Sequence, residues 1–163
     1  MKIHQISLKN HKKHKTALLD LIDQCPNVPI SGKGETVDKS DWFLNQGYER
    51  HYWNYFANNL LEPFYTKMNK TYKGSTQIKN YWFHQYTTKD YYGWHTHPDS
   101  HFSSVYYLEL SGQELVTEFK DLPTIKAKEG DIITFPAYLI HKSPINLTKT
   151  RKTVIVFNSS IWP

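Results

Sequence analysis

Apolar residues recur at helical spacing near the start of the chain. A helix is predicted from Asn10, whose side chain suits an N-cap, to Pro26, which ends the pattern. Its apolar face carries Ala17, Leu18, Leu21 and Ile22. The proline and glycine residues between positions 26 and 40 then predict a loop.

A second helical stretch is predicted from about Glu49 to Tyr72. Its apolar stripe consists of Tyr52, Phe56, Leu60 and Phe64. Pro63 lies within this stretch, and because proline has no backbone N–H and clashes with the preceding turn, we expect a kink or a new turn there. Both apolar faces are expected to pack on a sheet.

From position 76 onward the pattern changes to short runs that are rich in aromatic and β-branched residues. The predicted strands are Gln77–Tyr86, Phe102–Leu110, Gln113–Phe119, Thr124–Lys128, Asp131–Phe135, His141–Ile145 and Arg151–Asn158. Many short strands in close succession are typical of a sandwich or a jelly roll. We therefore predict a single, mainly β domain over residues 1–163, in which a helical segment, 1–75, supports a β core, 76–163.

The last predicted strand, RKTVIVFN, places an arginine beside apolar residues. Because side chains alternate along a strand, one face carries Arg151, Thr153, Ile155 and Phe157. Burying an unpaired guanidinium group is costly. Either this end of the strand is open to water, or an anion lies against Arg151.

Composition narrows the class of protein. The formal net charge is +5, and much of the excess lies in the N-terminal run NHKKHK and in single lysines. Such a run is more often the solvated start of a helix than a nucleic-acid site, although a basic surface leaves that second interpretation open. The single cysteine, Cys25, fits a reducing compartment, and with no long apolar run we expect a cytoplasmic protein without a membrane span or secretory signal.

Two histidines, His95 and His97, stand one residue apart in the segment GWHTHPDS. On an extended segment, residues two apart point to the same side, and imidazole is a common ligand of iron, zinc, copper and nickel. His141, which follows a predicted strand in EGDIITFPAYLIHKSP, offers a third ligand. A lone histidine is more often an ordinary hydrogen-bonding residue, but the pair together with His141 favours a metal site.

Three segments together carry a resemblance to a known family. GWHTHPDSHFSSVYYLEL, EGDIITFPAYLIHKSP and RKTVIVFN resemble the iron(II)- and 2-oxoglutarate-dependent oxygenases, and most closely a family of small oxygenases common in marine bacteria and tailed phages. That family shows H-x-H-P, S-x-x-Y-Y, G-D-x-x-x-F-P, a distal histidine, and an arginine leading into a strand that ends F-N. The resemblance covers Ile78 to Asn158 and, more loosely, Lys39 to Asn45. It implies a double-stranded β-helix, the jelly-roll barrel shared with cupins, in the cytoplasm of a bacterium or a phage-infected host.

The resemblance also implies roles for individual residues. His95 and His141 match the two histidine ligands of iron(II). Arg151 matches the arginine that binds the distal carboxylate of 2-oxoglutarate, a task for which the two parallel hydrogen bonds of a guanidinium group are well suited. Further contacts to this cosubstrate are implied for Thr153, Tyr107 and Tyr86.

The second position of the histidine pair departs from most of the superfamily, which has aspartate there. His97 would complete a three-histidine site with one negative charge fewer than the usual site of two histidines and a carboxylate. Asp99 is the alternative ligand if the loop bends, and otherwise a turn residue in P-D-S. His84 and His101 are expected behind the ligands, on the substrate side or at the surface.

The implied activity is that of a dioxygenase that uses Fe(II), O2 and 2-oxoglutarate to hydroxylate a C–H bond. A protein or peptide is favoured as prime substrate, because the spacing of the site residues is similar to that of prolyl hydroxylases; nucleic acids and small molecules stay open. One alternative is a metal-dependent cupin that does not use 2-oxoglutarate. Its usual glutamate is missing here, because the nearest downstream, Glu109, lies twelve residues past His97. The other alternative is a jelly-roll binding module without enzymatic activity.

Overall fold

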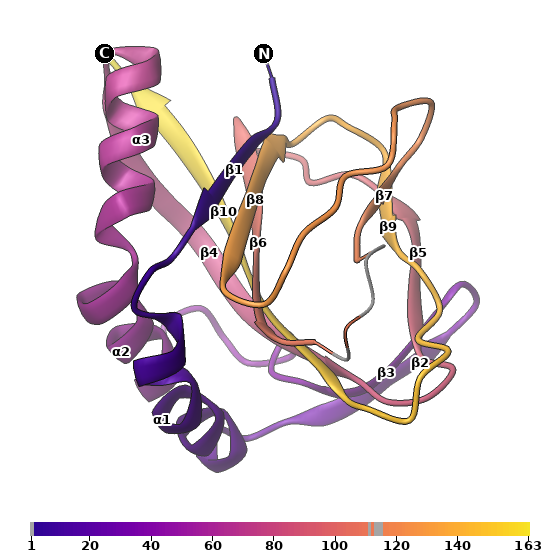
Figure 1. The fold of residues 1–163 in the computed structure, drawn as a ribbon. Coiled ribbons are helices and arrows are strands. Elements are labelled where there is room, and N and C mark those ends of the chain that lie inside the picture. The colour runs from indigo at the N-terminus through magenta and orange to yellow at the C-terminus, as the bar shows by residue number, and fades with distance from the viewer. Residues whose placement is uncertain (1, 111, 113–115) are drawn as a thin grey trace.

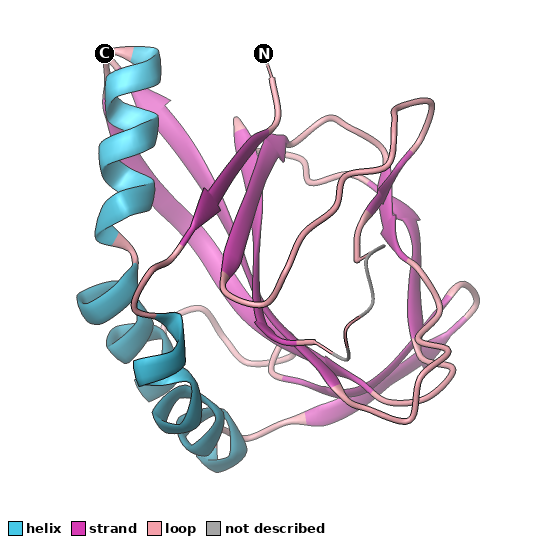
Figure 2. Ribbon diagram, viewed as in Figure 1, coloured by secondary structure: helices cyan, strands magenta, loops and turns pink. Residues whose placement is uncertain are grey.

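The computed structural model describes residues 2–110, 112 and 116–163. Within them, ten strands form one strongly curved sheet, and the helices lie along one side of it (Figures 1 and 2). The helices are α1 (His11–Gln24), α2 (His51–Leu60) and α3 (Glu62–Tyr72). The strands are β1 (His4–Ser7), β2 (Val28–Gly32), β3 (Glu35–Ser40), β4 (Ser75–Tyr86), β5 (Tyr91–His95), β6 (Phe102–Glu109), β7 (Glu118–Phe119), β8 (Asp131–Pro136), β9 (His141–Ser143) and β10 (Lys152–Trp162).

The last strand, β10, forms the middle of the sheet. It pairs antiparallel with β6 on one side, followed by β8 and β1, and with β4 on the other. Beyond β4 the sheet continues through β3, β5, β9 and β7, and Figure 1 shows that these strands curl back toward β8. The prediction of a mainly β fold with N-terminal helices is therefore confirmed.

Alternation along β10 divides the interior into two hydrophobic clusters. Ile155 and Phe157 pack in the cluster that includes the helices, where both are 0% exposed. Val154 and Val156 point the other way, into the cluster enclosed by the curled sheet. Full burial of side chains of this size stabilises the fold by about 2–3 kcal/mol each. The two faces of β10 thus look into different parts of the molecule.

The helix predictions hold with two corrections. The first helix lies where the pattern places it, between Asn10 and Pro26, but the Asn10 side chain makes no capping hydrogen bond, so that part of the prediction is wrong. The second stretch is two helices that meet at Leu61, and Pro63 lies in the first turn of α3, where backbone N–H groups have no intrahelical acceptor, so the missing N–H of proline costs no hydrogen bond. Pro63 thus begins a new helix. None of the helices in the described ranges is long and apolar enough to cross a membrane.

The segment 26–40, predicted as a loop, is the hairpin of β2 and β3, so that prediction is wrong. Gly34 supplies the positive φ (97°) that the turn requires. Pro29 is tolerated because β2 pairs only with β3 within the described part of the sheet, and an edge strand can accept proline. Together with β1, this hairpin makes the first 75 residues part of the sheet as well as its helical support.

The strand predictions in the second half hold except in two places. Residues 124–128 form no strand, and that prediction is wrong; the structure has only an isolated bridge there, at Lys126. The strand predicted over 113–119 begins outside the described residues, and β7 occupies its end. In addition, β5 ends at His95, so the histidine pair begins on a strand and continues into a loop.

Candidate functional site

A cavity of about 450 Å3 lies inside the curled sheet. Strands β4 and β10 form one of its walls. Eight side chains line this wall in four facing pairs, which are Tyr86 and Lys152, His84 and Val154, Trp82 and Val156, and Asn80 and Asn158. Inward-facing residues on one strand are about 7 Å apart, so the wall extends for about 20 Å.

Strands β5 and β9 bring histidines together beside this wall. His95 pairs directly with His141 in the register of the two strands. His97 follows two residues later, where its backbone N–H donates to the carbonyl of Ala137 at 2.9 Å. The potential ligand nitrogens of these three side chains all lie within 4.8 Å of one another. The structure therefore gathers the three histidines that the sequence proposed as ligands.

The free nitrogens of the cluster suit a divalent ion. The Nδ1 atoms of His95 and His141 donate to the carbonyls of Gly93 (2.7 Å) and Leu139 (2.9 Å), which leaves both Nε2 atoms unprotonated, the state a metal ligand needs. Nε2 of His97 lies 3.1 Å from Nε2 of His141. Two nitrogens on adjacent positions of one ion are roughly 3.0 Å apart when the bonds are about 2.1 Å long and at right angles.

The histidines also have the protonation state that a metal needs. Burial, reinforced by neighbouring imidazoles, lowers the pKa of His97 to about 3 and that of His141 to about 4. Burial likewise lowers the pKa of His95. All three rings are therefore neutral at pH 7, and a neutral imidazole is the form that binds metal.

The remaining acidic and histidine candidates lie outside the cluster. Asp99 is an exposed residue in the left-handed region (φ 65°) that lines the cavity without joining the three histidines. His101 accepts a hydrogen bond from the backbone N–H of Ile161 and lies beside Trp162, so it belongs to the surface. Of the two proposed third ligands, it is His97 that lies with His95 and His141.

His84 is a buried support of the cavity wall. Its Nε2 accepts a hydrogen bond from the indole N–H of Trp82 at 3.1 Å, and its Nδ1 donates to the hydroxyl of Ser40 at 3.0 Å. Burial lowers its pKa to about 3, so the ring is neutral and both nitrogens are used. Trp82 stacks on His97 with ring centroids 5.7 Å apart. His84 thus fixes the indole ring against which His97 packs, a role that sequence patterns did not reveal.

Arg151 and Thr153 do not reach the cavity, contrary to the expectation for a 2-oxoglutarate site. Nε of Arg151 donates to Oε1 of Glu109 at 2.8 Å, and the hydroxyl of Thr153 donates to the same oxygen at 2.9 Å. Arg151 immediately precedes β10, and Thr153 lies on the same face of that strand as Ile155 and Phe157, which pack toward the helices. Neither Arg151 nor Thr153 lines the cavity. The anion beside the arginine is therefore the protein's own carboxylate.

Lys152, the next residue along β10, points into the cavity instead. Its Nζ donates to the carbonyl of Val116 (2.8 Å) and the hydroxyl of Ser143 (2.7 Å), and lies 5.0 Å from the ring centre of Tyr86. The residue is 2% exposed, and no carboxylate lies within ion-pair distance in the described part of the chain. Burial lowers its pKa to about 7. This end of the cavity therefore carries a buried amine that makes no ion pair among the described residues.

The two tyrosines proposed as cosubstrate contacts lie at the same end of the cavity. Tyr86 lines it directly beneath the Lys152 ammonium group. Tyr107 lies behind the lining, where its hydroxyl is hydrogen-bonded to that of Thr117, which does line the cavity. Burial raises the pKa of both phenols, so neither carries a negative charge that would repel an anion.

Next to the histidine cluster the cavity has an aromatic rim. Trp42 is 52% exposed and meets Trp82 edge-on, with ring centroids 4.5 Å apart. Its backbone N–H donates to the Ser40 hydroxyl that also binds His84. One hydrogen-bonded chain therefore connects this rim with the ring that packs on His97.

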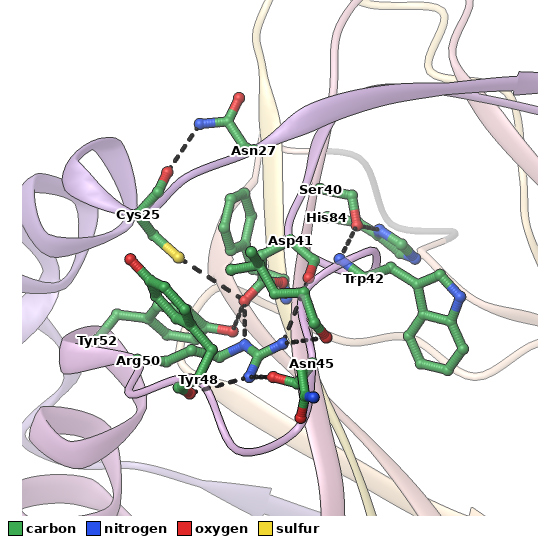
Figure 3. Close-up of polar contacts among 12 residues, drawn as sticks. Cys25, Asn27, Ser40, Asp41, Trp42, Asn45, Tyr48, Arg50, Tyr52 and His84 are labelled. Carbon is green, nitrogen blue, oxygen red and sulfur yellow. Dashed lines mark hydrogen bonds and ion pairs between the residues drawn. The ribbon is translucent and has the colours of Figure 1, made fainter.

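A buried ion pair fixes the loop that carries Trp42 (Figure 3). The carboxylate of Asp41 accepts hydrogen bonds from Nε of Arg50 (2.6 Å) and the hydroxyl of Tyr52 (2.7 Å), and both ion-pair side chains are 0% exposed. The guanidinium group also donates to backbone carbonyls of the same loop, namely those of Asn45, Tyr48, Asp41 and Leu44. The loop is thus tied to a single conformation from inside.

Comparison with known proteins identifies the architecture. No family model and no curated protein matches the chain. Among solved structures, it is similar to a 2-oxoglutarate–Fe(II) oxygenase family protein of Burkholderia pseudomallei (TM-score 0.75, 13% identity, 97% of this chain and 85% of that one). It is also similar to a viral collagen prolyl hydroxylase of Paramecium bursaria Chlorella virus-1, solved with 2-oxoglutarate (0.67, 13%, 98% and 96%). A third is a prolyl-4-hydroxylase of Pseudomonas putida (0.67, 13%, 99% and 93%). At this level of identity the likeness establishes the fold, and it confirms the predicted jelly-roll class.

Proposed function

We propose that the protein is an Fe(II)- and 2-oxoglutarate-dependent dioxygenase that hydroxylates a protein or peptide. The observation that carries the proposal is that one cavity contains both a neutral three-histidine cluster and a buried lysine that meets no carboxylate among residues 2–110, 112 and 116–163. The cluster alone would also fit a cupin. The lysine separates the two functions, because a buried unpaired cation is costly unless an anionic ligand accompanies it.

The protein's own residues hold the ion and one end of the cosubstrate. His95, His97 and His141 bind the metal through their free nitrogens. Bound iron(II) would supply oxygen activation coupled to the decarboxylation of 2-oxoglutarate. Lys152 and Ser143 bind the far carboxylate, since an ammonium group and a hydroxyl group both donate hydrogen bonds to it. The buried ring of Tyr86 keeps water from this ion pair.

The spacing of the two groups favours a dicarboxylate. Lys152 faces Tyr86, one inward-facing position, or about 7 Å, beyond the level of His84. Tyr92 stacks on His84 and contacts His95, so the metal ligands lie next to that level. A five-carbon chain with a carboxylate at each end can therefore reach from the histidines to Lys152.

A peptide is a better candidate for prime substrate than a nucleic acid. Two of the similar structures are described as prolyl hydroxylases. The rim of the cavity carries one lysine, Lys79, and one acid, Asp99, whereas a phosphate backbone is bound through several cationic contacts. Another lining cation, Lys142, is already 3.2 Å from Glu118. The charge at the rim thus suits a neutral chain.

The function is tested by measuring succinate formed from 2-oxoglutarate in the presence of Fe(II) and air. We expect turnover by the natural protein, loss of it in His141→Ala and in Lys152→Met, and retention in Arg151→Met. Arg151 is the matched control because it adjoins Lys152 but does not line the cavity. A protein that binds Fe(II) but forms no succinate would be a cupin-like metalloprotein, and one that binds no Fe(II) would be a binding module.

A further inference from the structure

The end of the cavity opposite Lys152 is lined by two carboxamides. Asn80 on β4 faces Asn158 on β10, and Nδ2 of Asn158 donates to Oδ1 of Asn80 at 2.8 Å. Three inward-facing positions, or about 20 Å, separate this pair from Lys152. Trp82, which stacks on His97, lies between them. The cavity therefore extends to both sides of the histidine cluster, toward a cation at one end and toward amides at the other.

Asn158 keeps an acceptor without a partner. The residue lines the cavity and is 4% exposed, yet its Oδ1 has no hydrogen-bond partner among the described residues. The hydroxyl of Ser103, which pairs with Asn158 across β6 and β10, is also buried and unpartnered there. Buried polar groups are almost always hydrogen-bonded, and an unmade bond is costly. A ligand that donates a hydrogen bond to Oδ1 would remove this cost.

Asn80 provides the complementary donor. Its Oδ1 is used by Asn158, and its half-buried Nδ2 has no partner within the described residues. One donor and one acceptor side by side match the N–H and C=O that a single residue of an extended peptide directs to the same side. We propose that the Asn80–Asn158 pair binds the backbone of the prime substrate, and that this substrate is an extended peptide segment. The proposal rests on the proposed function, since it assigns the other end of the cavity to the cosubstrate.

Trp42 provides a surface for a side chain of that peptide. The only polar atom of the Trp82 side chain is bound to His84, so Trp42 and Trp82 together present ring surface to the cavity. The buried Asp41–Arg50 pair holds the loop of Trp42 in place before any ligand arrives, which lowers the entropy cost of binding. An apolar or ring-bearing side chain next to the bound backbone would pack on Trp42.

The test uses twenty capped tripeptides, acetyl-Gly-Xaa-Gly-amide, titrated into the natural protein while its tryptophan fluorescence is recorded. We expect at least one to bind, with an apolar or ring-bearing Xaa. For every Xaa except proline, which has no backbone N–H, methylating the backbone nitrogen of Xaa removes the donor for Asn158. The methylated form should therefore bind at least about tenfold more weakly. In Asn158→Leu both forms should bind equally weakly, because the partner of the lost donor is absent.

Two further variants keep the test decisive. Asn80→Leu changes a half-buried residue and should weaken peptide binding even if Asn158→Leu fails to fold. Asn58→Leu, at an exposed position of α2, is the matched control and should bind like the natural protein. The proposal is overturned if no tripeptide binds, if methylation has no effect, or if single-stranded oligonucleotides bind and peptides do not. Failure of 2-oxoglutarate to bind would instead sink the proposed function, because the peptide titration requires neither iron nor cosubstrate.

Discussion

Replacing Lys152 with methionine should make the ligand-free protein more stable. Burial lowers the pKa of Lys152 from its ordinary value of 10.5 to about 7. The folded protein therefore loses the Lys152 proton near pH 7, whereas the unfolded chain keeps it until about pH 10.5. With these two pKa values, burial of Lys152 costs about 4 kcal/mol of folding free energy at pH 7. Methionine has a similar length and carries no charge, so this cost disappears.

Two losses offset part of this gain. The carbonyl of Val116 and the hydroxyl of Ser143 each lose a donor, at about 1 kcal/mol apiece. The net gain is about 2 kcal/mol at pH 7, or a rise in Tm of about 4–8 °C for a chain of this size. Below about pH 7 the cost of the lysine is fully present, and it shrinks as pH rises toward 10.5, because the unfolded chain then also loses the proton. The advantage of methionine should therefore fall by about 2 kcal/mol between pH 7 and pH 9.

Urea unfolding followed by circular dichroism at pH 7 and pH 9 measures both effects. Arg151→Met is the matched control, since Arg151 is partly exposed and paired with Glu109. Losing that pair should lower the free energy of unfolding by at most about 1 kcal/mol at either pH. If Lys152→Met proves less stable than the natural protein at pH 7, or if its advantage does not change with pH, Lys152 is not a buried unpaired cation and the reasoning fails.

Three other predictions follow from the same site and its surroundings. The affinity for 2-oxoglutarate should fall by about 50-fold from pH 7 to pH 9, because only the protonated form of Lys152, with a pKa of about 7, pairs with a carboxylate; calorimetric titration with Fe(II) present measures this, and a constant affinity would contradict it. His97→Asp should raise Fe(II) affinity by about tenfold, because it adds a negative charge beside a divalent ion in a buried site; equilibrium dialysis is the assay, and weaker binding would argue against His97 as a ligand. Asp41→Asn should lower the free energy of unfolding by about 3–5 kcal/mol, because it leaves the fully buried Arg50 without its anion; a loss below about 1 kcal/mol in urea unfolding would show that the pair does not fix the rim.

The histidine cluster was predictable because short stretches of sequence around each histidine indicate where its side chain lies. A spacing of two residues directs His95 and His97 to one side of an extended segment, and a predicted strand delivers His141. What joins them is the register of β5 and β9, which pairs His95 with His141. That register depends on long-range pairing, which the sequence pattern does not show.

The structure places the arginine expected at the cosubstrate outside the cavity and its neighbour Lys152 inside it. Alternation along RKTVIVFN correctly places Arg151 and Lys152 on opposite faces, but it does not say which face looks into the cavity. That choice is made by the helices, which cover the face of Ile155 and Phe157. The resemblance favoured the arginine, and the carboxylate that pairs with it, Glu109, lies 42 positions away in the sequence.

The hairpin at 28–40 was missed for a similar reason. Pro29 and Gly34 read as loop residues, and only the place of β2 next to β3, with no further partner within the described ranges, shows that an edge strand accommodates the proline. The unpartnered Oδ1 of Asn158 likewise depends on three-dimensional packing. Its one sequence signal is that Asn158 shares the face of Lys152, six positions earlier on the same strand.

The central claim is that a cavity with three metal-binding histidines holds 2-oxoglutarate against Lys152. Its most direct test is anaerobic titration of the Fe(II)-loaded protein with 2-oxoglutarate, followed by the visible charge-transfer band of a keto acid chelated to ferrous iron. We predict that the band forms in the natural protein and in Arg151→Met and that it is absent in Lys152→Met at the same concentrations. A band that is lost in Arg151→Met and kept in Lys152→Met, or one that forms in none of the three, would contradict the account.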